Sequence, residues 1–239
     1  MIGWPRVHYR ETDSTNERAK RLAAAGAKHG TLVTADAQTA GRGRQGRSWR
    51  APRGSALLMS LILRRLFPHH AVLPLTAAVA VCEACESVAP VECRIKWPND
   101  VWIGDRKLAG VLVEGRPQER WAVVGVGLNV TAGRLEFPWD LRDTATSLSA
   151  ETGARPDRES VLRALLEMLE RRLDDDVDDV IAAWRARDAL RGERVSWTGG
   201  VGVAAGIDRD GALLVDTEAG PVRLDAGEVH LLRGADGGS

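Results

Sequence analysis

The segment from residue 92 to residue 130 constrains the fold most strongly. It holds four short apolar runs, at 92–96, 100–103, 107–114 and 121–130, and only a few residues separate each run from the next. Gly104 and Asp105 supply one of the connecting turns. Because parallel strands need a crossover of a dozen or more residues, these runs predict an antiparallel meander rather than alternating strands and helices.

Helical patterns lie on both sides of this meander. Ser14 followed by Glu17 has the spacing of a capping box and predicts a helix that Gly26 closes. Apolar periodicity predicts a second helix from about Pro74 to Val88 and two more between residues 156 and 191. With further strands predicted at 31–36 and 55–63, the main part of the chain is predicted to be α+β.

The pattern of apolar and turn residues changes after Gly192. Short apolar runs alternate with turns such as Gly199-Gly200 and Asp210-Gly211, which predicts a separate small β-barrel. We therefore expect two domains, 1–191 and 192–239, with a disordered tail at 234–239.

Charge and hydropathy exclude several classes of protein. Lys and Arg number 33, as do Asp and Glu, so the formal net charge of zero argues against a dedicated nucleic-acid module. No apolar run approaches 18 residues and no signal peptide is recognisable, so we expect a cytoplasmic protein without a membrane partner.

Three groups of residues could suggest a metal site. Cys82 and Cys85 continue the apolar positions of a predicted helix, and a structural zinc site needs four ligands, so the three cysteines are interpreted as buried core thiols. His69 and His70 are weaker candidate ligands, and the acidic run 174–179 is interpreted as a solvated helix junction.

The loop from Gly41 to Trp49 carries the first chemical signal. Its sequence, GRGRQGRSW, fits the glycine pattern of a dinucleotide fingerprint and nearly fits a P-loop. Both motifs require a helix directly afterwards, whereas Pro52 and Gly54 interrupt the chain and a strand is predicted next. Backbone amides and three arginines in one loop can trap a phosphate or acyl phosphate, although a solvated basic loop or an RNA-binding segment is the alternative.

Two further motifs lie in the meander. Lys96-Trp97-Pro98-Asn99-Asp100 places an ammonium, an amide and a carboxylate at a bend, and Lys107 opens the following strand. The segment 125–129, GVGLN, places small residues in a strand, which is typical of close approach by a flat ligand or another backbone.

Taken together, these motifs resemble the biotin protein ligases. The residues that carry the resemblance are Asp13-Ser14-Thr15-Asn16, Gln38 with the GRGRQGRSW loop, KWPND at 96–100, Lys107-Leu108-Ala109-Gly110 with Val113-Glu114, and GVGLN at 125–129. The resemblance implies a seven-stranded mixed sheet related to class II aminoacyl-tRNA synthetases, followed by an SH3-like barrel. It also implies synthesis of biotinyl-5′-AMP from biotin and MgATP, then transfer of biotin to a lysine of a biotin carboxyl carrier domain.

The resemblance also implies roles for individual residues. Those expected to bind biotin are Ser14, Thr15, Asn16, Gln38, Arg42, Gly43, Arg44, Trp49, Lys107 and Gly125. Those expected to bind ATP are Arg44, Arg47, Trp49, Lys96, Asn99 and Asn129. Lys107, Arg44, Lys96 and Asp100 are expected to act in catalysis, with Asp100 as a candidate Mg²⁺ ligand.

Further expectations follow from the same resemblance. Ser14 lies too near the first residue to leave room for a winged helix-turn-helix, so we expect no DNA partner. A homodimer is expected because family members often dimerise. The alternatives are a lipoate or octanoate ligase of the same fold, or a non-catalytic Arg/Gly module that binds nucleic acid.

Overall fold

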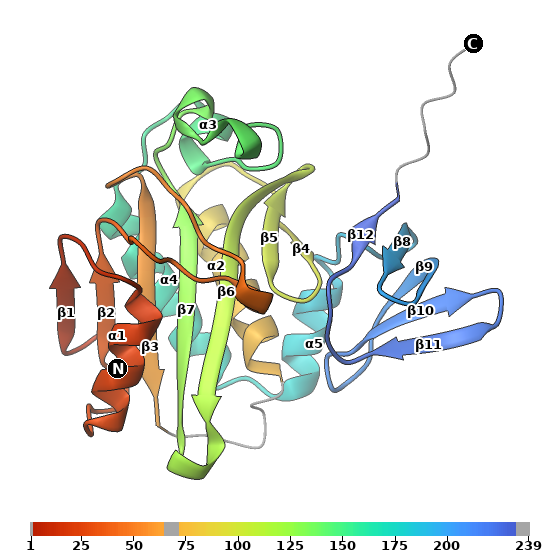
Figure 1. Cartoon of the computed structure of the whole chain (residues 1–239), viewed down its shortest axis with the longest axis horizontal. Coiled ribbons are helices and arrows are strands. Elements are labelled where there is room, and N and C mark those ends of the chain that lie inside the picture. Colours follow the sequence, from red (N-terminus) through yellow and green to blue (C-terminus); the bar gives the residue numbers. More distant parts are fainter. Residues whose placement is uncertain (1, 65–71, 233–239) are drawn as a thin grey trace.

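A computed structural model describes residues 2–64 and 72–232, which form two β-sheets with helices around them (Figure 1). The larger sheet has seven strands in the order β1-β2-β3-β7-β6-β5-β4. Its strands are β1 (Arg6–Tyr9), β2 (Leu32–Ala35), β3 (Ala56–Leu63), β4 (Arg94–Lys96), β5 (Asp100–Ile103), β6 (Arg106–Arg116) and β7 (Trp121–Asn129).

The predicted meander is confirmed. Strands β4 to β7 pair antiparallel with their neighbours in the chain, and β7 then pairs antiparallel with β3. The sheet is mixed because β1 pairs parallel with β2.

Helices cover both faces of this sheet. The helices are α1 (Thr15–Ala24), α2 (Leu73–Val88), α3 (Leu148–Thr152), α4 (Arg158–Leu173) and α5 (Val177–Arg185). Since side chains alternate along a strand, Ile62 of β3 packs with Ala19 of α1, whereas its neighbour Leu61 belongs to the core on the α2 side. The four predicted helices are confirmed, and the short α3 was not predicted.

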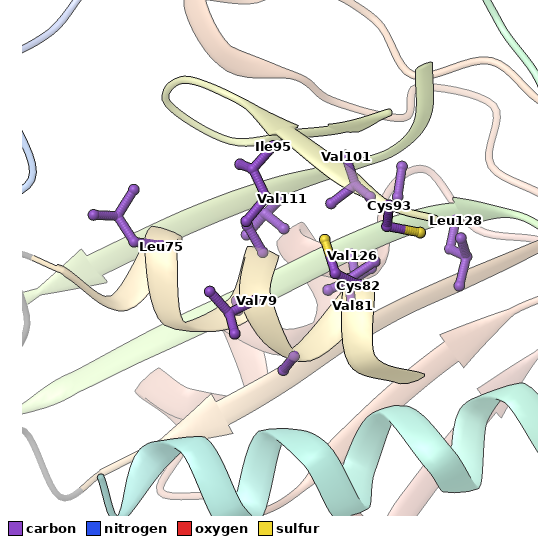
Figure 2. Close-up of a cluster of buried hydrophobic side chains, with 14 of the residues drawn as sticks. Leu75, Val79, Val81, Cys82, Cys93, Ile95, Val101, Val111, Val126 and Leu128 are labelled. Atoms are coloured by element: carbon purple, nitrogen blue, oxygen red, sulfur yellow. The ribbon is translucent and has the colours of Figure 1, made fainter. Parts of the chain in front are cut away.

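The main core lies between α2 and the strands. Figure 2 shows Val79 and Cys82 of α2 near Val111 of β6 and Val126 of β7. Cys82, Cys85 and Cys93 are all buried free thiols, and burial raises the pKa of Cys82 well above its usual range. The interpretation of these cysteines as core thiols is confirmed, while His69 and His70 lie outside the described residues.

The smaller sheet follows the large domain in the chain. It consists of β8 (Arg194–Trp197), β9 (Gly200–Ile207), β10 (Leu213–Thr217), β11 (Gly220–Leu224) and β12 (His230–Leu231), in the order β11-β10-β9-β8-β12. Within the described residues, β11 and β12 are its two edges, so hydrogen bonding does not close it into a barrel. The tail at 234–239 lies outside the described residues.

The start of α1 corrects one prediction. Ser14 is its N-cap, but the Ser14 side chain makes no capping hydrogen bond, so the capping box is wrong. The reason is that Glu17 faces two cations, with its Oε1 at 2.6 Å from both Lys20 Nζ and Arg42 Nη1. Gly26 does follow the helix with φ +93°, as its closing role requires.

None of the helices formed by residues 2–64 and 72–232 is long and apolar enough to cross a membrane.

Candidate active site

A cavity of about 570 Å³ opens on the face of the large sheet that carries α1. The loop between β2 and β3 crosses in front of β7 and β6 and forms its outer wall (Figure 1). Every residue for which a role was predicted lines this cavity, namely Ser14, Thr15, Asn16, Gln38, Arg42, Gly43, Arg44, Arg47, Trp49, Lys96, Asn99, Asp100, Lys107, Gly125 and Asn129. Motifs up to 115 residues apart in the sequence, from Ser14 to Asn129, therefore meet at one place.

Hydroxyl and amide groups form one part of the cavity wall. The backbone N–H and the hydroxyl of Thr15 both donate to Gln38 Oε1, at 2.7 and 3.0 Å. Ser60 Oγ lies 2.8 Å from Thr15 Oγ1 and 2.6 Å from Asn16 Oδ1. Thr15, Asn16 and Ser60 are almost fully buried. Gln38 is half-buried, so this part of the site offers fixed donors and acceptors without net charge.

The glycines of β7 make room for two side chains of the cavity wall, Trp49 and Asn16. A Cβ on Gly127 would lie 2.5 Å from the Trp49 ring, and a Cβ on Gly125 would lie 2.0 Å from Asn16 Oδ1. Both glycines face the α1 side of the sheet, two residues apart. The strand is approached closely, but by the side chains of Trp49 and Asn16 rather than by another backbone, and the prediction of a flat ligand beside it stays a prediction.

Cations gather at another part of the cavity, and some of them have carboxylate partners. Lys107 Nζ lies 2.7 Å from Asp100 Oδ1, and Lys107 also lies over the Trp49 ring at 5.7 Å. Arg47 Nη1 lies 2.7 Å from Glu228 Oε1, which belongs to the segment before β12.

Arg44 and Lys96 are different. Among the described residues, no carboxylate forms an ion pair with either side chain, although both face the cavity. Burial lowers the pKa of each, and the nearby Asp100 only partly offsets that effect. Lys96 instead lies 5.0 Å from the centre of the Trp102 ring. Both cations are therefore partly desolvated, which favours an anion beside them.

The bend between β4 and β5 fixes the position of Lys96. Trp97 is buried and its indole N–H donates to the carbonyl of Gly211, in the turn between β9 and β10, at 2.9 Å. Asn99 donates through Nδ2 to the carbonyl of Val111 and accepts from the Val111 N–H through its own backbone carbonyl. Asn99 thus ties the bend to β6 in addition to lining the cavity.

Asn129 has an unsatisfied oxygen. Its Nδ2 donates to the Thr146 carbonyl at 2.9 Å, which fixes the orientation of the amide. Its Oδ1 is buried and makes no hydrogen bond among the described residues, although the side chain lines the cavity. A buried acceptor of this kind calls for a ligand group.

Several cavity residues were not predicted. They are Ser48, Arg50, Met59, Trp102, Asp105, Gly110, Val111, Leu112, Val126, Phe137, Leu141, Asp143, Thr144, Ala145, His230 and Leu231. Backbone hydrogen bonds hold the segment 144–146 at the cavity. The backbone N–H of Lys107 donates to the Thr144 carbonyl, and the Lys107 carbonyl accepts from the Thr146 N–H. The apolar residues Phe137 and Leu141, just before this segment, line the cavity and could have signalled that this part of the chain packs on the site. No local signal points to His230.

Comparisons with known proteins agree with the geometry. Residues 8–130 match the biotin/lipoate A/B protein ligase family, and residues 192–232 match the biotin protein ligase C terminal domain. The biotin--[acetyl-CoA-carboxylase] ligase of Mycobacterium tuberculosis is 38% identical over 97% of this chain and 91% of that protein. The bifunctional ligase/repressor BirA of Bacillus subtilis is 36% identical over 97% of this chain and 75% of that protein.

A solved structure gives the same result. The biotin protein ligase from Aquifex aeolicus in complex with biotin and ATP superposes with a TM-score of 0.84 at 32% identity, covering 96% of this chain and 99% of that one. The chain therefore belongs to the biotin/lipoate A/B protein ligase family, and within it to the biotin protein ligases.

Proposed function

We propose that the protein joins biotin to a lysine of a biotin carboxyl carrier domain in two steps. In the first, a biotin carboxylate oxygen attacks the α-phosphorus of ATP, which gives biotinyl-5′-AMP and releases pyrophosphate. In the second, the amine of the acceptor lysine attacks the acyl carbon, an amide forms, and AMP leaves. The relatives named as biotin ligases and the solved complex with biotin and ATP support this reaction.

The neutral polar wall suits the ring system of biotin. The ureido group carries N–H donors and a carbonyl acceptor, and Ser14, Thr15 and Gln38 offer hydroxyl and amide partners of matching size. Trp49 and the flat surface over Gly125 supply the apolar wall beside them.

One observation carries the proposal, namely that Arg44 and Lys96 face the cavity without an ion-paired carboxylate in the described part of the chain. The biotin carboxylate and the ATP phosphates repel each other, so their approach requires positive charge at the reacting centre. Cations already paired with a carboxylate have part of their charge neutralised. We therefore assign the stabilisation of the phosphates to Arg44 and Lys96.

Lys107 is assigned to the biotin carboxylate. Its ammonium lies between the Trp49 ring and the Asp100 carboxylate, and Asp100 holds it in place beside the apolar wall. In the second step Asp100 is suited to orient the amine of the acceptor lysine, since its carboxylate lies in the cavity beside Lys107 and acts on Lys96.

A magnesium ion fits the available oxygen donors. Among the described residues no group of three or more His, Cys, Asp or Glu side chains could hold a metal. Magnesium at a nucleotide commonly takes one or two protein oxygens and completes its shell with phosphate and water. The unsatisfied Asn129 Oδ1 and the carboxylate of Asp100 are suitable donors, and Mg²⁺ there would neutralise phosphate charge.

We extend the proposal to organisation and partners. The division into a catalytic domain, 1–191, and a C-terminal domain, 192–239, stays a prediction, as do the SH3-like barrel and the relation to class II synthetases. The match of residues 192–232 to a biotin protein ligase domain supports the second unit. A homodimer, cytoplasmic location and the absence of a DNA partner also stay predictions; a mobility shift with operator DNA would contradict the last of these.

Intact-mass spectrometry of a carrier domain tests the reaction. The carrier is incubated with the protein, biotin and MgATP, with parallel samples that lack ATP or contain lipoate or octanoate in place of biotin. We expect a gain of one biotinyl group that requires ATP. A lipoyl or octanoyl adduct without biotinylation would favour the alternative ligase of the same family.

A further inference from the structure

A chain of charged contacts runs behind the arginine-rich loop, between α1 and β6. Arg42 Nη1 lies 2.6 Å from Glu17 Oε1, and Lys20 Nζ lies 2.6 Å from the same oxygen. Lys20 Nζ also lies 2.6 Å from Glu114 Oε1, so one ammonium serves two carboxylates. None of the predicted biotin or ATP roles involves Glu17 or Lys20.

This chain of contacts continues into the neutral wall of the cavity. Asn16 Nδ2 donates to Glu114 Oε2 at 2.8 Å, and Asn16 Oδ1 lies 2.6 Å from Ser60 Oγ. Ser60 in turn contacts Thr15, which donates to Gln38. A continuous series of ion pairs and hydrogen bonds thus connects a loop arginine to the side chains that would receive the ring system of biotin.

The charges within the network balance. Two carboxylates, Glu17 and Glu114, face two cations, Lys20 and Arg42. Burial lowers the pKa of Lys20, but its two carboxylate partners raise it by more. Burial likewise raises the pKa of Glu114, and hydrogen bonds from Lys20 and Asn16 lower it by more. Lys20 and Glu114 therefore both stay charged near neutral pH, and removal of either leaves its partner uncompensated.

We infer that Glu17 and Lys20 are positioning residues for biotin, which act by holding Arg42 of the loop and Asn16 of the cavity floor in one arrangement. Neither residue lines the cavity, so each acts through its neighbours. The inference rests on the proposed function for its ligand, whereas the anchoring of the loop through Arg42 does not depend on which ligand binds.

Glu17→Gln tests the inference directly, because it removes the charge and keeps the shape of the side chain. We expect the KM for biotin to rise roughly five- to tenfold, since a charge-assisted contact to a binding residue is lost. The kcat and the KM for ATP should stay within about twofold of the wild type. Glu17→Asp keeps the charge and should recover part of the biotin affinity, which a merely structural role would not predict. Lys20→Met should also raise the KM for biotin.

Glu159→Gln is the matched control. Glu159 also pairs with an arginine, Arg6 Nη1 at 2.6 Å, but this pair lies on α4 and β1 away from the cavity. This variant should leave every kinetic constant unchanged. Equal effects of Glu17→Gln and Glu159→Gln on the KM for biotin would overturn the inference.

Limited trypsin digestion without ligands separates this inference from the proposed function. If Glu17 holds the loop, Glu17→Gln should be cut faster than wild type between residues 42 and 47, whatever the ligand. Unchanged cleavage there would overturn the anchoring even if the wild type biotinylates its carrier. Faster cleavage in a protein that does not bind biotin would support the anchoring and refute only the proposed ligand.

Discussion

Replacing Gly125 with alanine should damage both stability and biotin binding. The new Cβ would lie 2.0 Å from Asn16 Oδ1, whereas an ordinary contact begins at 3.4 Å, so Asn16 must move by 3.4 − 2.0 = 1.4 Å. A movement of this size can break the 2.6 Å contact with Ser60 and the 2.8 Å hydrogen bond to Glu114. A neutral hydrogen bond contributes about 1 kcal/mol and one to a carboxylate about 2 kcal/mol, so we expect a loss of about 3 kcal/mol.

Thermal unfolding and calorimetric titration with biotin measure this effect. For a chain of this length, a loss of that size should lower Tm by roughly 6–12 °C. Biotin affinity should fall by at least about tenfold, because Asn16 belongs to the cavity wall. Gly133→Ala is the control, since its Cβ would approach only the flexible end of Glu136, at 3.3 Å. A Gly125→Ala variant with the Tm and biotin affinity of the Gly133→Ala control would refute the steric argument.

Three further predictions concern the cations. Arg44→Gly should let biotinyl-5′-AMP escape, so that bystander proteins gain biotin in a mass-spectrometric assay; labelling confined to the carrier would contradict a retention role. Burial lowers the pKa of Lys96, so kcat/KM for ATP should fall as the pH rises through that lowered pKa and the ammonium loses its charge. Lys96→Arg should move this fall to higher pH. The free energy of unfolding should change in the opposite direction and rise with pH between the folded and unfolded pKa values of Lys96. In that range the unfolded chain binds more protons than the folded one, and the cost of burying the charge falls as the pH rises. Arg47→Glu should raise the KM for ATP, and adding Glu228→Arg should restore part of it if their 2.7 Å ion pair matters; additive losses would show that it does not.

Strands with strong local patterns were predictable from the sequence. The runs that became β3 and β5 to β7 are apolar over most of their length and bounded by turn residues. The strand β1 was not predicted, because its sequence RVHY is polar at every second position and only half-buried. Its parallel pairing with β2 depends on residues more than 20 positions away, which a local pattern does not encode.

The cavity illustrates the same limit. Lys96 and Lys107 could be identified because each lies in a compact motif, and the chain uses lysine rarely. His230 reaches the cavity only through the packing of the smaller sheet, so its own neighbours in sequence carry no signal. Trp102 lies two residues after the KWPND motif, but its place at the cavity depends on the pairing of β5, whose register shifts between Val101 and Trp102. The predicted capping box was wrong for a related reason. The Glu17 carboxylate pairs with Lys20 and with the distant Arg42 instead of accepting from the backbone N–H of the N-cap residue.

The hydrogen bond from the Trp97 indole to Gly211 links the folding of the two sheets. Arg185 of α5 also donates to the Ile207 carbonyl, and Ile207 and Leu213 share one buried cluster with α2. Parts of a chain that share a core unfold cooperatively, so calorimetry should record a single transition. Nucleotide that binds beside Lys96 should then slow amide hydrogen exchange in β9 and β10, although neither strand lines the cavity. Exchange in the smaller sheet would in that case report on occupancy of the site.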